Sequence, residues 1–412
     1  MSKVVVVGGG VVGLFSAWFL QKKGFQVTVI DRGDFTNGCS HFNAGLIVPS
    51  HVIPLASPGM LRKGIKNLLN SKSPVGFRIA PEKDLLRWYL KFTAVANERH
   101  VHRSINVLRD LSLLSKDLFT DLKESGELDF PLWQNGLLML YQAEKAGEDL
   151  REEAEIAKEA GLDVEELSQA DIRKLEPGIQ AEVSGGFHYH SDDHLNPSVL
   201  MQALYVSLES KDVQFVKDCT VTTIQTSAQK ATALETDKGI FEFEELVIAA
   251  GMWSSQLLKK LKVNIDVQPG KGYSFMTKQT PVNYPALLAD ANVAATPLGN
   301  GLTQFAGGME IGYTGYTITA ARVQNIIKGA NSFYRLDQNI EPKETEIWQG
   351  HRPCSFDGLP YIGRVPEFQN IHVGTGHSMM GLTLGPVTGL LLSESIAGEK
   401  TSLDLNPFRI GR

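Results

Sequence analysis

Residues 4–31 read VVVVGGGVVGLFSAWFLQKKGFQVTVID, and this stretch decides the fold. Val4–Val7 is a run of β-branched residues, which suits a strand buried on both faces. The pattern then predicts a helix over Val11–Lys23 that ends at Gly24, and a second strand over Gln26–Ile30. The stretch therefore predicts a βαβ unit of the kind that builds a parallel sheet.

The turn between this strand and this helix carries the G-x-G-x-x-G pattern. Gly8 permits the tight turn, Gly10 lets the backbone approach a pyrophosphate, and Gly13 lets helix and strand pack closely. Asp31 follows Gly13 at close to the spacing of roughly 20 residues at which an acid accepts hydrogen bonds from a ribose. Strand, glycines, helix and acid together predict that the chain binds an adenine dinucleotide.

Composition sets outer limits. The chain has 412 residues, of which 42% are hydrophobic and 21% charged, enough for two globular domains. A net charge of −6 argues against a nucleic-acid partner. The three cysteines (Cys39, Cys219 and Cys354) are too scattered for a zinc site or a disulfide framework, which indicates a reducing compartment.

The chain enters its first strand directly after Met1-Ser2-Lys3, which predicts a cytoplasmic protein without a signal peptide. The run Met379–Leu392 is the most apolar late in the chain, but glycines and a proline break it and it is too short to span a bilayer. No transmembrane segment is expected. The sequence carries no signal for an oligomeric state.

The remaining pattern predicts an α/β protein. We expect a mostly helical region over Leu85–Lys123, and helices over Glu144–Ala160 and Ser198–Ser210, from Ser254, and from about Leu382 to Ala397. We expect strands over Gly136–Tyr141, Gly185–Tyr189, Val213–Val216, Thr220–Gln225, Glu244–Ala250, Ser274–Thr277, Leu302–Ala306, Glu346–Gln349 and Ile371–Val373. The last strands before residue 350 alternate apolar and polar residues, which favours an antiparallel sheet facing a ligand.

Motifs along nearly the whole chain identify a family. They are Ser40 with Asn43-Ala44-Gly45, Ala56–Gly59, Leu175–Pro177, Gly185-Gly186, Ala249–Gly251, Lys271–Ser274, G-x-R-P-x-x-x-D-G-x-P-x-x-G over Gly350–Gly363, and G-x-G-H over Gly374–His377. On these motifs the chain resembles the D-amino acid oxidase/glycine oxidase superfamily of FAD enzymes, most closely its bacterial D-amino acid dehydrogenase branch. The resemblance implies a Rossmann-like FAD-binding domain with a parallel sheet, and a second, α+β substrate domain on a mainly antiparallel sheet.

The order of the expected helices and strands indicates the domain limits. The FAD-binding domain is expected to be discontinuous, over 1–52, 190–266 and 351–412, with the substrate domain over 53–189 and 267–350. Sarcosine-oxidase relatives hold their flavin through a cysteine, and Cys354 is offset from that position. We therefore expect FAD bound without a covalent link.

The implied reaction is oxidative deamination of a small D-amino or D-imino acid, with hydride transfer from Cα to flavin N5 and electrons passed to a quinone or another carrier. Two alternatives stay open: an oxidase of glycine, sarcosine or D-amino acids that uses oxygen, and a dehydrogenase of cyclic D-imino acids such as D-proline or cis-4-hydroxy-D-proline. A third class is a nicotinamide enzyme or a flavin module that acts on tRNA. The motif around Arg352 disfavours the nicotinamide enzyme, and the net charge disfavours the tRNA module.

Three residues are candidates for the substrate site. Arg352 occupies the carboxylate-binding position of the family, and a guanidinium can bind a carboxylate through two parallel hydrogen bonds. Relatives carry a tyrosine where this chain has Val293, so Tyr273 either supplies that hydroxyl or is a buried structural tyrosine. His51, like His41, is expected to line the pocket.

For the cofactor, the helix starting near Met380–Thr383 is expected to point its amino end at the flavin ring, where reduction builds negative charge. Val221 matches the family's backbone contact to adenine. The complete set of expected FAD-binding residues is Gly8, Gly10, Val11, Val12, Gly13, Asp31, Arg32, Ser40, Asn43, Ala44, Gly45, Val221, Gly251, Gly376, Met380, Gly381, Leu382 and Thr383.

Two features stay open. The histidines His188, His190 and His194 lie close in sequence to Asp192 and Asp193. A metal site is one interpretation of this group, but we favour loop carboxylates beside a substrate cleft, or plain surface polarity, and predict no metal. The segment 53–77 places Leu61, Ile65, Leu68 and Leu69 opposite Arg62, Lys63, Lys66 and Lys72. This pattern fits a helix at the inner face of the cell membrane, in peripheral contact with lipid, or a lid or domain-packing helix.

Overall fold

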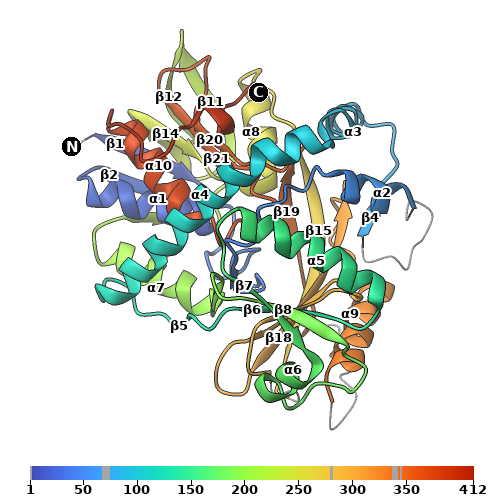
Figure 1. The fold of residues 1–412 in the computed structure, drawn as a ribbon. Coiled ribbons are helices and arrows are strands. Elements are labelled where there is room, and N and C mark those ends of the chain that lie inside the picture. Colours follow the sequence, from blue (N-terminus) through green and yellow to red (C-terminus); the bar gives the residue numbers. More distant parts are fainter. Residues whose placement is uncertain (1, 67–74, 279–281, 336–341, 344–345) are drawn as a thin grey trace.

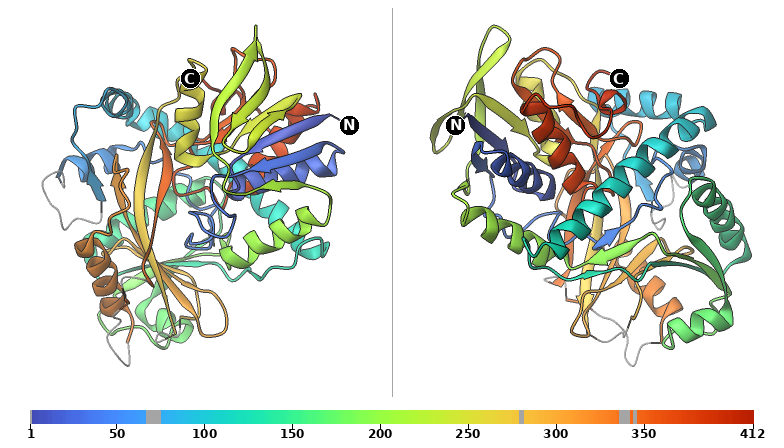
Figure 2. Two further views of the ribbon diagram at one scale, coloured as in Figure 1. Left: turned by 180° about the vertical axis from the view of Figure 1, so that it is seen from behind. Right: turned by 60° about the vertical axis from the view of Figure 1, so that its left-hand side comes forward.

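The computed structural model describes residues 2–66, 75–278, 282–335, 342–343 and 346–412. Two large sheets dominate the molecule, a six-stranded sheet at one end and a nine-stranded sheet at the other (Figures 1 and 2). This arrangement confirms the predicted α/β fold with one largely parallel and one largely antiparallel sheet.

The six-stranded sheet has the order β10-β2-β1-β14-β21-β20. Its strands are β1 (Lys3–Val7), β2 (Gln26–Ile30), β10 (Gln214–Val216), β14 (Glu245–Ile248), β20 (Tyr361–Arg364) and β21 (Ile371–Thr375). All neighbours are parallel except β20 and β21. Segments from both ends of the chain therefore lie side by side in one sheet.

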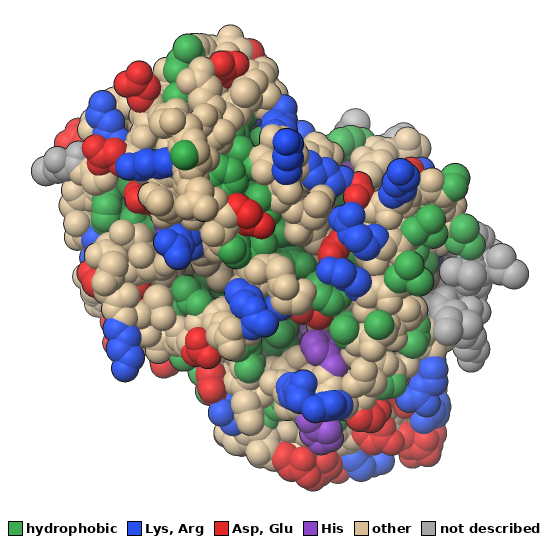
Figure 3. All heavy atoms as spheres, turned by 90° about the horizontal axis from the view of Figure 1, so that it is seen from above, with side chains coloured by type: hydrophobic (Ala, Val, Ile, Leu, Met, Phe, Trp, Pro, Cys, Tyr) green, Lys and Arg blue, Asp and Glu red, His purple; other side chains and the backbone are tan. Residues whose placement is uncertain are grey.

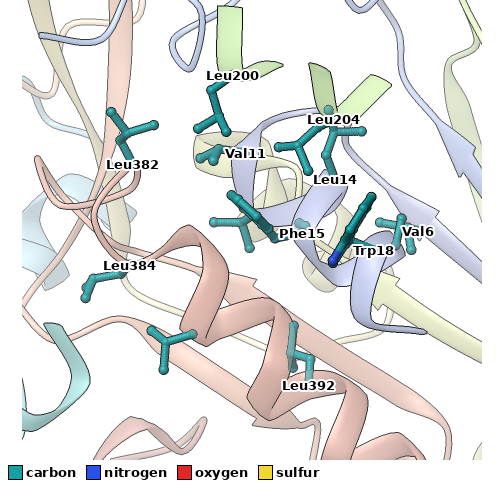
Figure 4. Packing of buried hydrophobic residues seen from close by; sticks show 14 of the residues in the cluster. Val6, Val11, Leu14, Phe15, Trp18, Leu200, Leu204, Leu382, Leu384 and Leu392 are labelled. Carbon is teal, nitrogen blue, oxygen red and sulfur yellow. The ribbon is translucent and has the colours of Figure 1, made fainter. Parts of the chain in front are cut away.

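Strand β1 is buried on both faces, as its β-branched sequence predicts. Val4 and Val6 pack on one face against α1 (Val11–Lys22), α7 (Pro197–Glu209) and α10 (Gly385–Ile396), and Figure 4 shows side chains of this cluster. Val5 and Val7 pack on the other face with residues of β14 and of α8 (Ser254–Lys260).

The nine-stranded sheet has the order β19-β15-β18-β17-β16-β6-β8-β7, with a short strand β4 beside β18. Its strands are β4 (Val75–Phe77), β6 (Leu137–Tyr141), β7 (Val164–Ser168), β8 (Gly185–Tyr189), β15 (Val267–Thr277), β16 (Ala286–Leu288), β17 (Val293–Pro297), β18 (Thr303–Ile311) and β19 (Trp348–Ser355). Helix α9 (Ala320–Phe333) packs on one face and α5 (Glu144–Glu159) on the other.

Smaller elements complete the fold. One three-stranded sheet joins β11 (Val221–Ser227), β12 (Lys230–Thr236) and β13 (Gly239–Glu242), and another joins β3 (Leu46–Ile47), β9 (Asp193–Leu195) and β5 (Leu132–Trp133). The other helices are α2 (Pro58–Lys66), α3 (Lys83–Val95), α4 (Glu98–Glu124) and α6 (Gln169–Leu175), with 3-10 turns at η1 (Gly251–Trp253) and η3 (Asn406–Phe408).

The helical region expected over Leu85–Lys123 is confirmed, and it consists of α3 and α4, since Asn97 caps α4 by accepting a hydrogen bond from the amide of His100. Other boundaries differ from those expected. The strands expected at Val213–Val216 and Thr220–Gln225 belong to two different sheets. Helix α10 begins at Gly385 instead of near Leu382, with Pro386 in its first turn, where the missing N–H costs nothing.

The predicted domain limits stay a prediction. Strand β19 runs through the expected limit at residue 351, and β9 pairs with β3 and β5, which come from opposite sides of the proposed division. All three cysteines lie in the described part of the chain and are free. No helix among the described residues combines the length and apolarity needed to cross a membrane.

Candidate functional site

A cavity of about 1340 Å³ lies between the two large sheets. Its wall includes the turn after β1, the end of β2, the loop that follows it, and one face of β15, β17, β18 and β19. The carboxyl ends of β1, β2 and β14 open into it, which is where parallel α/β sheets bind their ligands.

Most of the expected site residues line this cavity. They are Gly8, Gly10, Val11, Val12, Asp31, Arg32, Ser40, Asn43, Ala44, His51, Val221, Gly251, Tyr273, Arg352, Met380, Gly381 and Leu382. His41 and Val293 line it as well. The structure therefore gathers residues from distant parts of the chain around one space.

Four expected cofactor residues do not line the cavity, and each makes a structural contact instead. A Cβ on Gly13 would lie 1.8 Å from the carbonyl oxygen of Gly8, and a Cβ on Gly45 would lie 2.4 Å from that of Leu195. Gly376 adopts a φ of +82°. Thr383 donates its hydroxyl to the carbonyl of Leu46.

The turn after β1 is built to receive an anion. Gly8 has a φ of +115°, and a Cβ there would lie 2.4 Å from the carbonyl oxygen of Ala249. The carboxylate of Asp31 accepts the amides of Gly9 at 2.6 Å and Gly33 at 2.7 Å, which fixes the turn. Helix α1 begins at Val11, directly after Gly10, and the amide of Val11 donates to the hydroxyl of Ser40 at 2.9 Å. The glycine turn and this serine therefore meet the cavity at the amino end of the helix, a setting that suits a pyrophosphate.

A second group of amides faces the cavity before α10. The segment between His377 and Gly385 forms consecutive turns, in which Met380 donates to His377 and Leu384 donates to Met380. Within the described structure, the amides of Gly381, Leu382 and Thr383 have no hydrogen-bond partner. They are the donors that we expected at the amino end of the helix, here supplied by the preceding turns.

The opposite end of the cavity holds an aromatic contact that the sequence did not reveal. The guanidinium carbon of Arg32 lies 3.6 Å from the ring centroid of Trp253, a cation–π contact. Arg32 also donates to the hydroxyl of Tyr316 at 3.3 Å. Val221, the expected adenine contact, lines the cavity with Trp253, so this end presents the flat surfaces that a base can stack on.

Arg352 is a partly buried cation without an acidic partner. Its Nη1 donates to the carbonyl oxygen of Gly308 at 2.8 Å, and across the described ranges no carboxylate forms a salt bridge with it. Burial lowers the pKa of its guanidinium below the usual value. A buried cation that lacks a counter-ion is costly unless an anion reaches it, so the site is prepared for an anionic ligand.

Gly272 makes room for this guanidinium. The β15–β19 register pairs Gly270 with Arg352 and Gly272 with Gly350. A Cβ on Gly272 would lie 2.1 Å from Nη1 of Arg352 and 2.6 Å from its Cζ. The absence of a side chain at residue 272 therefore sets the position of the guanidinium.

Replacing Gly272 by alanine is expected to displace Arg352 and to raise the concentration needed for half-maximal substrate binding by about tenfold, the loss of one charge-assisted hydrogen bond. The backbone tolerates alanine, because φ at Gly272 is not in the left-handed region. Titration of G272A, R352K and the double variant with substrate measures the concentration for half-maximal binding in each. If the two effects add fully in the double variant, Gly272 does not act through Arg352.

Tyr273 points to the other face of the sheet. Its hydroxyl donates to the carboxylate of Glu310 at 2.6 Å and accepts from the amide of Thr319 at 3.3 Å. Burial raises the pKa of this hydroxyl. Of the two alternatives that the sequence left open, this geometry favours the structural tyrosine.

His51 lines the cavity, and burial lowers its pKa to about 4, so its ring is neutral at pH 7. Its Nδ1 lies 3.4 Å from the hydroxyl of Ser50, which donates at 2.5 Å to the buried carboxylate of Asp192. Burial raises the pKa of Asp192 to about 7. The sequence left Asp192 open as a carboxylate on a loop beside the substrate cleft, and the fold brings it beside Ser50.

Comparisons with known proteins agree over the full length of the chain. A family model described as FAD dependent oxidoreductase (DAO) matches residues 3–395. A D-amino acid dehydrogenase of Vibrio vulnificus (strain CMCP6) is 28% identical over 408 residues, and one of Helicobacter pylori is 29% identical over 406 residues; each match covers 97% of both proteins.

Solved structures show the same fold. Glycine oxidase from Geobacillus kaustophilus superposes with a TM-score of 0.78 at 23% identity, over 100% of this chain and 99% of that one. L-Proline dehydrogenase from P. horikoshii does so with a TM-score of 0.70 at 19% identity, over 99% and 96%.

Proposed function

The chain belongs to the DAO family of FAD-dependent oxidoreductases, and we propose that it oxidises a small D-amino or D-imino acid at Cα and passes the electrons to a quinone or another carrier. The relatives named D-amino acid dehydrogenase support this assignment. The observation that carries it is the unpaired guanidinium of Arg352, which shares one cavity with the glycine-rich turn.

The residues present fit FAD. The amino end of α1, with Gly10 and Ser40 beside it, would hold the pyrophosphate, and Asp31 would accept a ribose hydroxyl. The free amides of Gly381 and Leu382 would stabilise negative charge on the ring system. The chemistry that FAD supplies when bound is acceptance of the two electrons and the hydrogen that leave Cα.

In this proposal the protein contributes position and surroundings. Arg352 binds the α-carboxylate through two parallel hydrogen bonds, which fixes the orientation of Cα. Met139, Leu287 and Val48, which belong to one apolar cluster, form a wall that excludes water around the substrate side chain. His51, neutral because of its burial, accepts a hydrogen bond from the substrate's amino group.

The test is anaerobic bleaching of the flavin colour of the purified protein. The panel contains D-amino acids, D-proline, cis-4-hydroxy-D-proline, glycine, sarcosine and the matching L-amino acids. We expect bleaching by D-amino or D-imino acids and none by the L-forms. Acid precipitation is expected to release FAD into the supernatant, whereas colour left in the pellet would show a covalent link. Bleaching by L-forms alone would contradict the proposal.

We propose peripheral membrane contact through α3 and the loop before it. Ile79, Leu86 and Leu90 are 73%, 51% and 71% exposed, and Leu86 and Leu90 are one helical turn apart. Figure 3 shows hydrophobic and basic side chains next to one another on the face that includes this region. A membrane quinone would then be reached at the inner face of the cell membrane.

Segment 53–77, which the sequence suggested for membrane contact, packs against the protein where the structure describes its side chains. Met60 and Leu61 of α2 pack against the hydrophobic core, and Met60 lines the cavity, which favours the lid or domain-packing alternative. The side chains of Lys63, Ile65, Lys66, Leu68, Leu69 and Lys72 lie outside the described residues.

We expect substrate-reduced protein to reoxidise faster with a quinone in anionic vesicles than with oxygen. Stopped-flow mixing measures both rates, and a soluble dye serves as a third acceptor. Replacing Leu86 and Leu90 by asparagine should slow the vesicle reaction only, because the exposed leucines do not reach the cavity. Oxygen reoxidation at the turnover rate with stoichiometric hydrogen peroxide would make the protein an oxidase.

A further inference from the structure

A group of two histidines and a glutamate lies at the edge of the nine-stranded sheet, outside the cavity. His188 is on β8 and Glu165 directly faces it on β7, the outermost strand. His190 follows two residues after His188, just past the end of β8, so both imidazoles can lie on one side of the sheet. None of the three lines the flavin cavity.

The potential ligand atoms of these side chains are close together. One nitrogen or oxygen from each of the three lies within 4.8 Å of the other two. Nε2 of His190 is 3.3 Å from a carboxylate oxygen of Glu165, and the rings of His188 and His190 have centroids 4.0 Å apart. This spacing needs only small side-chain rotations to bring all three within bonding distance of one ion, since Glu165 and His190 are exposed.

His188 is already held in the form that a metal requires. Its Nε2 donates to the carbonyl oxygen of Asn135 at 2.9 Å, which leaves Nδ1 with a free lone pair. Gly136, with a φ of +81°, leaves room for the ring, because a Cβ there would lie 2.3 Å from Nε2.

His194, Asp193 and Asp192 are close in sequence to this group but contact other residues. His194 stacks on Trp133 with ring centroids 4.9 Å apart. Asp193 pairs with Lys116 at 3.1 Å, and Asp192 accepts the hydroxyl of Ser50. The fold therefore keeps His188 and His190 together and apart from His194. The third potential ligand is Glu165, which comes from the neighbouring strand.

We propose that Glu165, His188 and His190 bind one divalent transition-metal ion of the zinc class. Two imidazoles and one carboxylate suit Zn²⁺ and leave a fourth position for water. The ion takes the position between His190 and Glu165, and it ties the outermost strand β7 to β8. It contributes no step to the oxidation, because the site and the cavity have no residue in common.

The test uses the full-length, tag-free protein after treatment with a chelator, titrated with ZnCl₂ in a calorimeter and melted with and without zinc. We expect one strong equivalent per chain and a higher melting temperature, because the ligand binds the folded state. The variants H190A and E165Q change exposed side chains and should fold. Each should raise the Kd for zinc by at least about tenfold, which corresponds to a loss of about 1.4 kcal/mol of binding free energy.

His102 supplies the matched control, since it is an exposed histidine on α4 away from the three ligands. The variant H102A should bind zinc as the unchanged protein does. Equal zinc affinity in H190A, E165Q and the unchanged protein would overturn the proposal, as would the absence of a strong site. Flavin bleaching by substrate should be the same with and without zinc, so this result is independent of the proposed oxidation.

Discussion

Replacing Arg352 by lysine is expected to leave FAD bound and to raise the substrate concentration for half-maximal bleaching by about 10- to 150-fold, equivalent to about 1.5–3 kcal/mol. Lysine keeps the charge but loses the planar pair of donors that the carboxylate needs. The contact of Nη1 with the carbonyl of Gly308 is lost as well. Anaerobic substrate titration followed by flavin absorbance measures the change.

The control for this experiment is R364K, because Arg364 is exposed at the end of β20. It should titrate as the unchanged protein does. Full affinity in R352K would assign Arg352 to the structure of strand β19 and its neighbours instead of to the substrate. Loss of FAD in R352K would show that the residue also supports the cofactor.

Replacing Gly13 by alanine is expected to abolish stable FAD binding and to destabilise the protein by about 1–3 kcal/mol or more, the usual cost of overpacking. The added Cβ would lie 1.8 Å from the carbonyl oxygen of Gly8, which is backbone and cannot rotate away. Helix α1 must then move from β1, and the turn that faces the pyrophosphate moves with it. Flavin content after gel filtration and thermal melting measure both effects.

The matched control is G59A in α2, where a Cβ would meet nothing within 4 Å. Alanine in a helix should be neutral or stabilising by up to about 1 kcal/mol. Normal FAD content in G13A would contradict the close packing that the structure places between α1 and β1.

The sequence predicts the βαβ unit almost to the residue because every signal there is local. The observed bounds of β2 are those expected, and α1 ends one residue early. The strand signal, the turn glycines and the helix end lie within a single stretch, so no distant contact decides them. Signals within a single stretch of sequence also predict β8 and most of α5 and α7.

Strand β15 shows why elements outside the βαβ unit were harder to predict from the sequence. Its sequence begins Val267-Gln-Pro-Gly-Lys-Gly, which reads as a break, so we expected a strand only from Ser274. The glycines are there because side chains of β18 and β19 need the space: a Cβ on Gly270 would lie 2.5 Å from the sulfur of Met309. Such a reason is visible only once the register is known.

Single residues and motifs of the candidate site could be predicted from the sequence, but the contacts between them could not. Arg352 and the glycine motif came from family resemblance and local pattern, whereas the roles of Gly272, Trp253 and Asp192 depend on contacts across sheets. Glu165 was not selected at all, because an exposed glutamate has no signal until β7 pairs with β8.

The six-stranded sheet also has a consequence for biosynthesis. Its β1 lies between β2 and β14, a strand from the middle of the chain, and α1 packs so tightly on α10 that a Cβ on Gly389 would lie 2.5 Å from the backbone of Phe15. On the ribosome, the amino-terminal unit emerges about 350 residues before α10 and exposes its apolar helix until then. The cavity is complete only after the segment before α10 has been synthesised, and a nascent chain that stops short of α10 leaves the apolar face of α1 exposed to chaperones and proteases.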